Sequence, residues 1–174
     1  MLRNVLRVLV SDLFLLMRRI FGCRVTFNLV SIVSPIAVLR TKSGGKINLN
    51  SKVGIRPGTE ISATHGEIYI GRNCFINRNC LIVAHESVVL KDNVTIGPGT
   101  YIYDHDHDGM GSFTTKKIVI GENVWIGAGC IILKGVTIGK DAVIAAGTIV
   151  TKDVPDNTII RSKCEYVIKE LEDK

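Results

Sequence analysis

Two histidines lie two residues apart in the stretch DHDHDGMGSFTTKK. His105 and His107 are half of the four histidines in this chain of 174 residues. A neutral imidazole, with an unperturbed pKa near ~6.5, can accept a proton from a hydroxyl group at neutral pH, so a histidine here suits general base catalysis. Asp104, Asp106 or Asp108 could orient or support the imidazolium that forms, and the sequence does not choose among the three.

The same stretch interrupts a repeat with a period of six residues, which fits neither an α-helix nor a simple alternating strand. Each hexad opens with an aliphatic residue, and these openers are Ile47, Val53, Ile70, Ile76, Ile82, Leu90, Ile96, Ile102, Ile120, Ile126, Ile132, Ile138, Ile144 and Val150. The fifth place of each hexad is small, as in Cys74, Cys80, Val94, Thr100, Val124, Cys130, Val136, Ala142, Thr148 and Val154.

Three hexads make one coil with three short flat faces, and stacked coils pair as strands about 4.8 Å apart. We expect the opener of each hexad to point inward and the fifth residue to fill a narrow interior corner, where a large side chain would overpack the column. Cys74, Cys80 and Cys130 are therefore predicted to be structural residues rather than reactive thiols.

The interruption keeps the hexads in phase, because Ile120 follows Ile102 by 18 residues, one full coil. The hexad positions between them, 108 and 114, are not aliphatic. This predicts a loop over residues 103–117 that replaces two faces of one coil. A loop on a rigid scaffold is a favourable place for chemistry.

Charge is unevenly distributed along the chain, whose formal net charge is +6. Residues 1–46 hold eight Lys and Arg and one acid, whereas the remainder is nearly neutral, which argues against a nucleic-acid partner. The five cysteines include no CxxC pair and no zinc-ligand spacing, so no metal is expected and a reducing, cytoplasmic compartment is indicated.

Residues 1–22 predict an amphipathic helix with Arg3, Arg7, Ser11 and Arg18 on one stripe and leucines on the other. Two interpretations stay open: the helix packs on its own domain or a sister subunit, or it lies on an anionic membrane surface. Its longest uncharged run is far shorter than the ~20 residues that a spanning helix needs.

The segment GPGTYIYDHDHD resembles the one that carries the catalytic histidine in galactoside and maltose acetyltransferases, members of the hexapeptide-repeat acyltransferases. Counting from Ile102, His107 matches that histidine, and His105 is the competitor. The resemblance implies a mainly β protein, a left-handed parallel β-helix over residues 47–160. A transitional segment, 23–46, precedes this domain and a tail, 161–174, follows it. It also implies a homotrimer with the active site between neighbouring subunits.

Two further segments extend the resemblance to the binding residues. FINRNCLIV resembles the stretch whose first asparagine contacts the acceptor sugar, although asparagine is also common in turns. His85 falls where these enzymes carry an acid near the acceptor. The segment from 121 to 155 resembles the coenzyme A-binding half, and Lys163 suits a coenzyme A phosphate although the usual G-x-P-A-[KR] motif is missing. The residues so implied are Asn77, His85 and His105 for the acceptor, and Trp125, Gly127, Ala128, Ala145, Ala146, Thr151, Lys152 and Lys163 for acetyl-CoA.

These matches predict an acetyl-CoA-dependent O-acetyltransferase that acts on a hydroxyl of a sugar or a surface-polysaccharide precursor, in the cytoplasm or at the inner face of its membrane. One alternative is an N-acetyltransferase for an amino sugar. A remote alternative is a zinc hydratase of the γ-carbonic-anhydrase type, because His65, His85 and His105 are spaced twenty residues apart. A noncatalytic scaffold is the last alternative.

Overall fold

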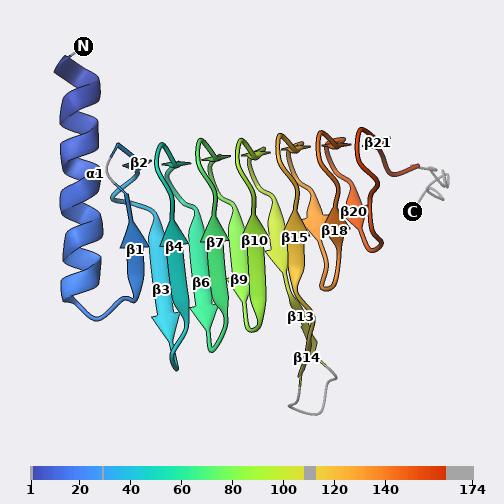
Figure 1. Cartoon of the computed structure of the whole chain (residues 1–174), viewed down its shortest axis with the longest axis horizontal. Coiled ribbons are helices and arrows are strands. Elements are labelled where there is room, and N and C mark those ends of the chain that lie inside the picture. Colours follow the sequence, from blue (N-terminus) through green and yellow to red (C-terminus); the bar gives the residue numbers. More distant parts are fainter. Residues whose placement is uncertain (1, 29, 108–112, 164–174) are drawn as a thin grey trace, which may run out of the picture.

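A computed structural model gives the architecture and describes residues 2–28, 30–107 and 113–163. Asp108, the middle of the expected loop and the tail from residue 164 onward lie outside the described residues. The described chain forms one helix, α1 (Leu2–Ile20), followed by a three-sided prism of parallel strands (Figure 1).

Each side of the prism is a parallel sheet to which every coil adds one strand. Sheet A contains β1 (Val25–Phe27), β4 (Lys46–Leu49), β7 (Glu67–Ile70), β10 (Ser87–Leu90), β15 (Ile118–Ile120) and β18 (Thr137–Ile138). Sheet B contains β2 (Ile32–Val33), β5 (Gly54–Ile55), β8 (Phe75–Ile76), β11 (Thr95–Ile96), β16 (Trp125–Ile126), β19 (Val143–Ile144) and β21 (Ile159–Ile160). Sheet C contains β3 (Val38–Lys42), β6 (Glu60–Thr64), β9 (Leu81–Ala84), β12 (Tyr101–Tyr103), β17 (Ile131–Ile132) and β20 (Ile149–Val150).

The hexad pattern correctly predicts the core of this prism. All fourteen hexad openers are at most 2% exposed, and all ten fifth-place residues are at most 4% exposed. The first two openers are buried but out of register, because Leu49 rather than Ile47 pairs with Ile70, and Ile55 rather than Val53 pairs with Ile76. Burial of the small fifth residues agrees with the narrow interior corners expected from the sequence.

Coil length varies along the prism. The loop over residues 103–117 is therefore built into its coil in a different way from the one predicted. The segment 23–46 supplies β1, β2 and β3, the first strand of each sheet. Val88 pairs with Ile118, so the coil that contains the histidines takes 30 residues, whereas Val119 pairs with Thr137 in the next coil after 18. The loop is therefore an insertion between two intact faces, and the expected replacement of two faces is wrong.

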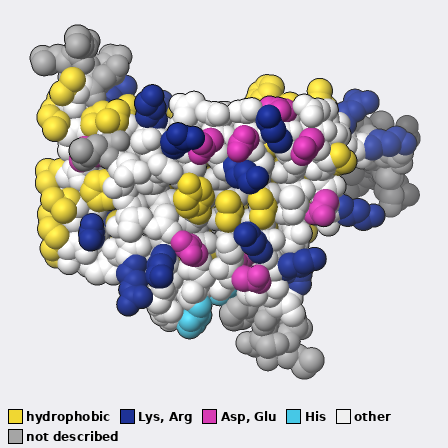
Figure 2. Space-filling model, in the orientation of Figure 1, with side chains coloured by type: hydrophobic (Ala, Val, Ile, Leu, Met, Phe, Trp, Pro, Cys, Tyr) yellow, Lys and Arg dark blue, Asp and Glu magenta, His cyan; other side chains and the backbone are white. Residues whose placement is uncertain are grey.

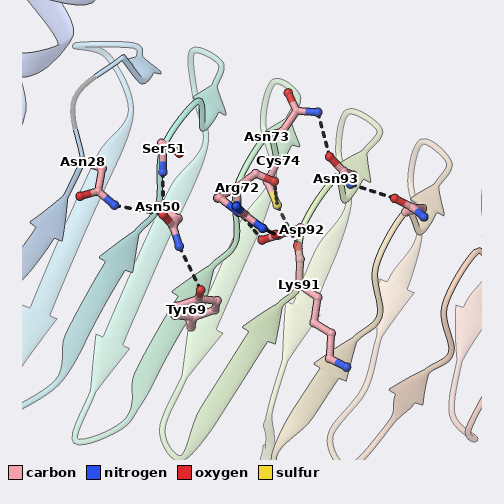
Figure 3. A network of polar contacts seen from close by, with 11 residues as sticks. Asn28, Asn50, Ser51, Tyr69, Arg72, Asn73, Cys74, Lys91, Asp92 and Asn93 are labelled. Atoms are coloured by element: carbon pink, nitrogen blue, oxygen red, sulfur yellow. Dashed lines mark hydrogen bonds and ion pairs between the residues drawn. The ribbon is translucent and has the colours of Figure 1, made fainter.

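The edge between sheets A and B carries a ladder of polar side chains (Figure 3). Asn73 donates to Asn93, Asn93 to Asn123, and Asn123 to Asp141, over 3.0, 2.9 and 2.7 Å. All four residues have positive φ angles between 56° and 62°, a backbone region that asparagine and aspartate tolerate well. This ladder accounts for these asparagines as turn residues that connect successive coils.

The interior cysteines are structural, as predicted. Each thiol donates to a carbonyl oxygen of the next coil: Cys74 to Lys91, Cys80 to Gly97 and Cys130 to Ala145. Burial raises the pKa of all three thiols, that of Cys74 to about 11. A protonated, enclosed thiol is a poor nucleophile.

Helix α1 covers the open N-terminal end of the prism. Leu15 is fully buried, the backbone N–H of Val33 donates to the Ser11 hydroxyl over 2.8 Å, and Arg18 donates to the carbonyl of Leu39. These contacts satisfy groups at the free edge of the first coil, which would otherwise be open to pairing with another chain. No helix among the described residues has both the length and the hydropathy that crossing a bilayer requires.

Candidate active site

The candidate residues lie in two groups on different parts of the prism. The first group lies on the C–A edge, where the chain passes from sheet C to sheet A, and consists of His85, His105, His107, Thr151 and Lys152. The second group lies on sheet B or on the B–C edge beside it and consists of Asn77, Trp125, Gly127, Ala128, Ala145, Ala146 and Lys163.

The histidines of the C–A edge stand on an antiparallel hairpin made of β13 (His105–His107) and β14 (Phe113–Thr115). Asp104, directly before the hairpin, is fully buried. Its carboxylate accepts hydrogen bonds from the backbone N–H groups of His85, Glu86 and Ser87 over 2.7–3.0 Å. The base of the hairpin is thereby fixed to the turn of the preceding coil.

The following coil holds the hairpin from its other side. The backbone N–H of Gly135 donates to the carbonyl of Lys116 over 2.9 Å, at the end of the hairpin. Lys134 lies 3.0 Å from the carboxylate of Asp106 and also donates to the Thr114 hydroxyl. The two strands of the hairpin are thus held together by one cation from the next coil, a role for Lys134 that the sequence did not predict.

Three imidazoles gather above this base. The ring centroid of His105 lies 4.3 Å from that of His85 and 5.3 Å from that of His107, and the rings of His105 and His107 meet edge to face. The side chain of His105 is only 10% exposed, and its Nδ1 lies 3.4 Å from the Asp104 carboxylate. His107 is exposed and lines an open hollow of about 550 Å³ together with Tyr103, His105, Asp106 and Leu133. Both candidate bases line the hollow, and His107 is the more exposed of the two.

The environment of His85 keeps its imidazole neutral. Burial lowers the pKa of His85, and the neighbouring His105 lowers it further. The folded chain therefore binds fewer protons than the unfolded chain as the pH falls below 6.5, the ordinary pKa of histidine.

A pH dependence of stability follows from this pKa. We expect the free energy of unfolding to decrease as the pH is lowered through 6.5, and we expect His85→Gln to weaken that decrease. Thermal unfolding of both proteins on either side of this pH measures the effect. Equal losses of stability in the two proteins would show that His85 is not responsible.

Coils approach each other closely at the B–C edge. A Cβ atom on Gly127 would lie 2.6 Å from the backbone nitrogen of Ala146, and one on Gly97 would lie 2.5 Å from that of Ala128. Glycine at these positions is required by coil stacking. Ala128 and Ala146 are exposed, so this part of the edge carries small side chains and leaves room for an extended ligand.

Trp125 and Asn77 accompany this small-residue edge. The Trp125 side chain is 57% exposed on sheet B, where its neighbours in the strand register are Thr95 and Val143. Asn77 is half-buried on the B–C edge, and its side-chain oxygen accepts from the backbone N–H of Arg78. Asn77 is not among the residues with positive φ, whereas Asn79 is, so a backbone requirement does not explain asparagine at 77.

The two groups cannot form one site within a single chain. In a three-sided prism the edge between sheets C and A lies opposite sheet B. Figure 1 accordingly shows the hairpin leaving the lower side of the prism while the strands of sheet B run along the upper side. His107 and Trp125 therefore point away from each other.

Comparison with known proteins identifies the family. The profile described as bacterial transferase hexapeptide (six repeats) matches residues 117–152, and that of the hexapeptide repeat of succinyl-transferase matches residues 67–104. A galactoside O-acetyltransferase of Lactococcus lactis is 33% identical over 139 residues, which cover 76% of this chain and 67% of that protein. The chain belongs to the hexapeptide-repeat acetyltransferases.

Other known proteins are also similar to this chain. The galactoside O-acetyltransferase of Escherichia coli is 41% identical over 113 residues, and the chain spans only 56% of its length. A hexapeptide-repeat acetyltransferase of Vibrio cholerae, solved with acetyl coenzyme A, is 31% identical with a TM-score of 0.61 over 75% of this chain and 72% of that one. An N-acyltransferase of Bacillus cereus shares the fold, with a TM-score of 0.73 and 22% identity over 90% of this chain and 89% of that one.

The hydratase alternative requires residues that are placed to ligate a metal ion. Among the described residues no group of three or more His, Cys, Asp or Glu is placed to hold one. His65, which the hydratase alternative requires, is exposed one coil before His85.

Proposed function

We propose that this chain is an acetyl-CoA-dependent O-acetyltransferase that acts on a hydroxyl of a sugar or of a surface-polysaccharide precursor. The observation that carries the proposal is an exposed imidazole, His107, on a clamped hairpin beside an open hollow in a member of this family. Two of the relatives are named galactoside O-acetyltransferases, and a similar solved structure is named a maltose O-acetyltransferase.

The proposed reaction is direct transfer with His107 as general base. The acceptor hydroxyl loses its proton to the imidazole as its oxygen attacks the thioester carbonyl carbon. A backbone N–H stabilises the tetrahedral oxyanion. The carbon–sulfur bond then breaks, and the protonated imidazole returns the proton to the departing coenzyme A thiolate. His105, beside Asp104, supports the charge that His107 acquires, and Asn77 with the neutral His85 contacts the acceptor.

The site that we propose is shared between subunits of a homotrimer. Because His107 and Trp125 lie on opposite sides of one chain, the C–A edge of one subunit must meet the B–C edge and sheet B of its neighbour. Trp125 and the small residues Gly127, Ala128, Ala145 and Ala146 border the pantetheine arm of acetyl-CoA. The cations Lys152 and Lys163, with Thr151, serve its phosphates and adenosine end.

A panel of acceptors tests the proposal. With acetyl-CoA as donor, we expect turnover on galactosides, maltose or a polysaccharide precursor without amino groups, followed as release of the coenzyme A thiol. Turnover confined to amino sugars would replace the proposal by the N-acetyltransferase alternative. The absence of both turnover and acetyl-CoA binding would leave a noncatalytic scaffold.

A further inference from the structure

Helix α1 contacts the prism through the side that carries its polar stripe and Leu15, and leaves its apolar stripe uncovered. Ser11, Leu15 and Arg18 make the contacts to the first coil. At 100° per residue the opposite side of the helix is apolar. We call this side the outer helix face. Its members are 42–66% exposed and comprise Val5, Leu6, Leu9, Leu13, Leu16, Met17 and Ile20.

The outer helix face points along the long axis of the prism, whereas the three sheets face sideways. Figure 1 shows α1 standing across the N-terminal end, at right angles to the long axis. Since its contacts are to the free edge of the first coil, its outer face points away from the prism along that axis. This step rests on the homotrimer of the proposed function. If its three prisms lie side by side, their three outer helix faces point in the same direction and form one platform.

Basic residues flank this platform. At the C-terminal end of α1, Arg19, Arg24 and Lys46 line a hollow of about 480 Å³ that has no acidic residue among its described lining. On the side of sheet B, an apolar groove of about 310 Å³ continues the outer helix face through Leu6 and Val10. Arg7 and Arg56 also line this groove. Figure 2 shows hydrophobic side chains gathered along α1, with Lys and Arg nearby.

We infer that the outer helix face is the surface by which the protein docks on an anionic lipid bilayer. An exposed apolar stripe with flanking cations fits a membrane interface, where the stripe enters the acyl boundary and the cations meet lipid phosphates. A second copy of the chain fits less well, because it would bring the same cations against one another. Docking would hold the protein at the surface that carries lipid-linked acceptors.

Co-sedimentation with vesicles tests the inference on the full chain. We expect the protein to pellet with phosphatidylcholine vesicles that contain phosphatidylglycerol, and to do so less as salt rises. Replacing Leu9, Leu13 and Leu16 together by Gln should weaken this partition about a hundredfold. Arg19→Gln with Arg24→Gln should weaken it about fivefold for each cation. The matched control is Ile159→Gln, a 73% exposed residue at the opposite end of the prism, which should bind like the wild type.

Three outcomes would overturn the inference. The wild type could fail to pellet with anionic vesicles, or the triple Gln variant could pellet as well as the wild type. The triple variant could also dissociate an oligomer in gel filtration while no vesicle binding is seen, which would assign the face to a second copy. Turnover on a water-soluble acceptor, measured on the same variants, is expected to be unchanged. Its absence in the wild type would refute the proposed function and not the docking surface.

Discussion

Replacing His107 by alanine is expected to lower the turnover number by about 10²–10⁴-fold while acetyl-CoA still binds. The expectation rests on the exposed imidazole beside the hollow, which the proposed function assigns as the general base. Trp125→Ala is expected to raise the KM for acetyl-CoA, because it removes a 57% exposed side chain that is proposed to border the pantetheine arm and leaves His107 in place. Steady-state kinetics and titration of acetyl-CoA separate the two effects.

His65→Ala is the matched control for this prediction. His65 is an exposed histidine at the same edge of the prism, and it lies outside the described lining of the hollow. Its replacement should leave turnover close to that of the wild type. Turnover retained in His107→Ala but lost in His105→Ala would transfer the role of base to His105.

Asp104→Ala is expected to cost about 3 kcal/mol of the free energy of unfolding. The substitution removes the acceptor of three backbone N–H groups, each worth about 1 kcal/mol or more when left without a partner. It also frees the base of the hairpin, so we expect turnover to fall as well. Denaturant unfolding measures the first effect and steady-state kinetics the second.

Asp106→Ala provides the comparison for Asp104. Asp106 is exposed and pairs with Lys134 at the surface of the same hairpin, an interaction worth at most about 1 kcal/mol. If Asp104→Ala and Asp106→Ala destabilise the protein equally, the buried carboxylate does not clamp the hairpin in the way described.

Much of the prism could be predicted from the sequence because its interior tolerates few residue types. An inward position such as Ile126 or Ile132 accepts an aliphatic side chain, and the corner at Cys130 accepts only a small one. The pattern weakens in the first coils for a physical reason. Strand β4 there holds four residues with two inward side chains, Ile47 and Leu49, which breaks the count of six.

Other features depend on contacts that no local pattern records. The pairing of Lys134 with Asp106 joins residues on different coils. Asp104 could be named as a candidate beside the histidines, but its burial among the N–H groups of the preceding turn is a property of stacking. Amphipathicity likewise identified α1 but not which stripe would face the prism, and the polar stripe did so because the free strand edges offer polar groups.

Mixing two impaired subunits, assayed at acetyl-CoA concentrations far below the raised KM of Trp125→Ala, tests most directly whether the active site lies between chains. If each site takes His107 from one subunit and Trp125 from its neighbour, a trimer that mixes His107→Ala and Trp125→Ala chains contains one intact site. Random assembly from equal amounts should then restore about a quarter of wild-type turnover, and the mixed trimers isolated alone about a third. Co-expression of the two variants with different affinity tags, followed by purification on both tags, isolates the mixed trimers. Turnover no higher than that of the separate variants would contradict the account.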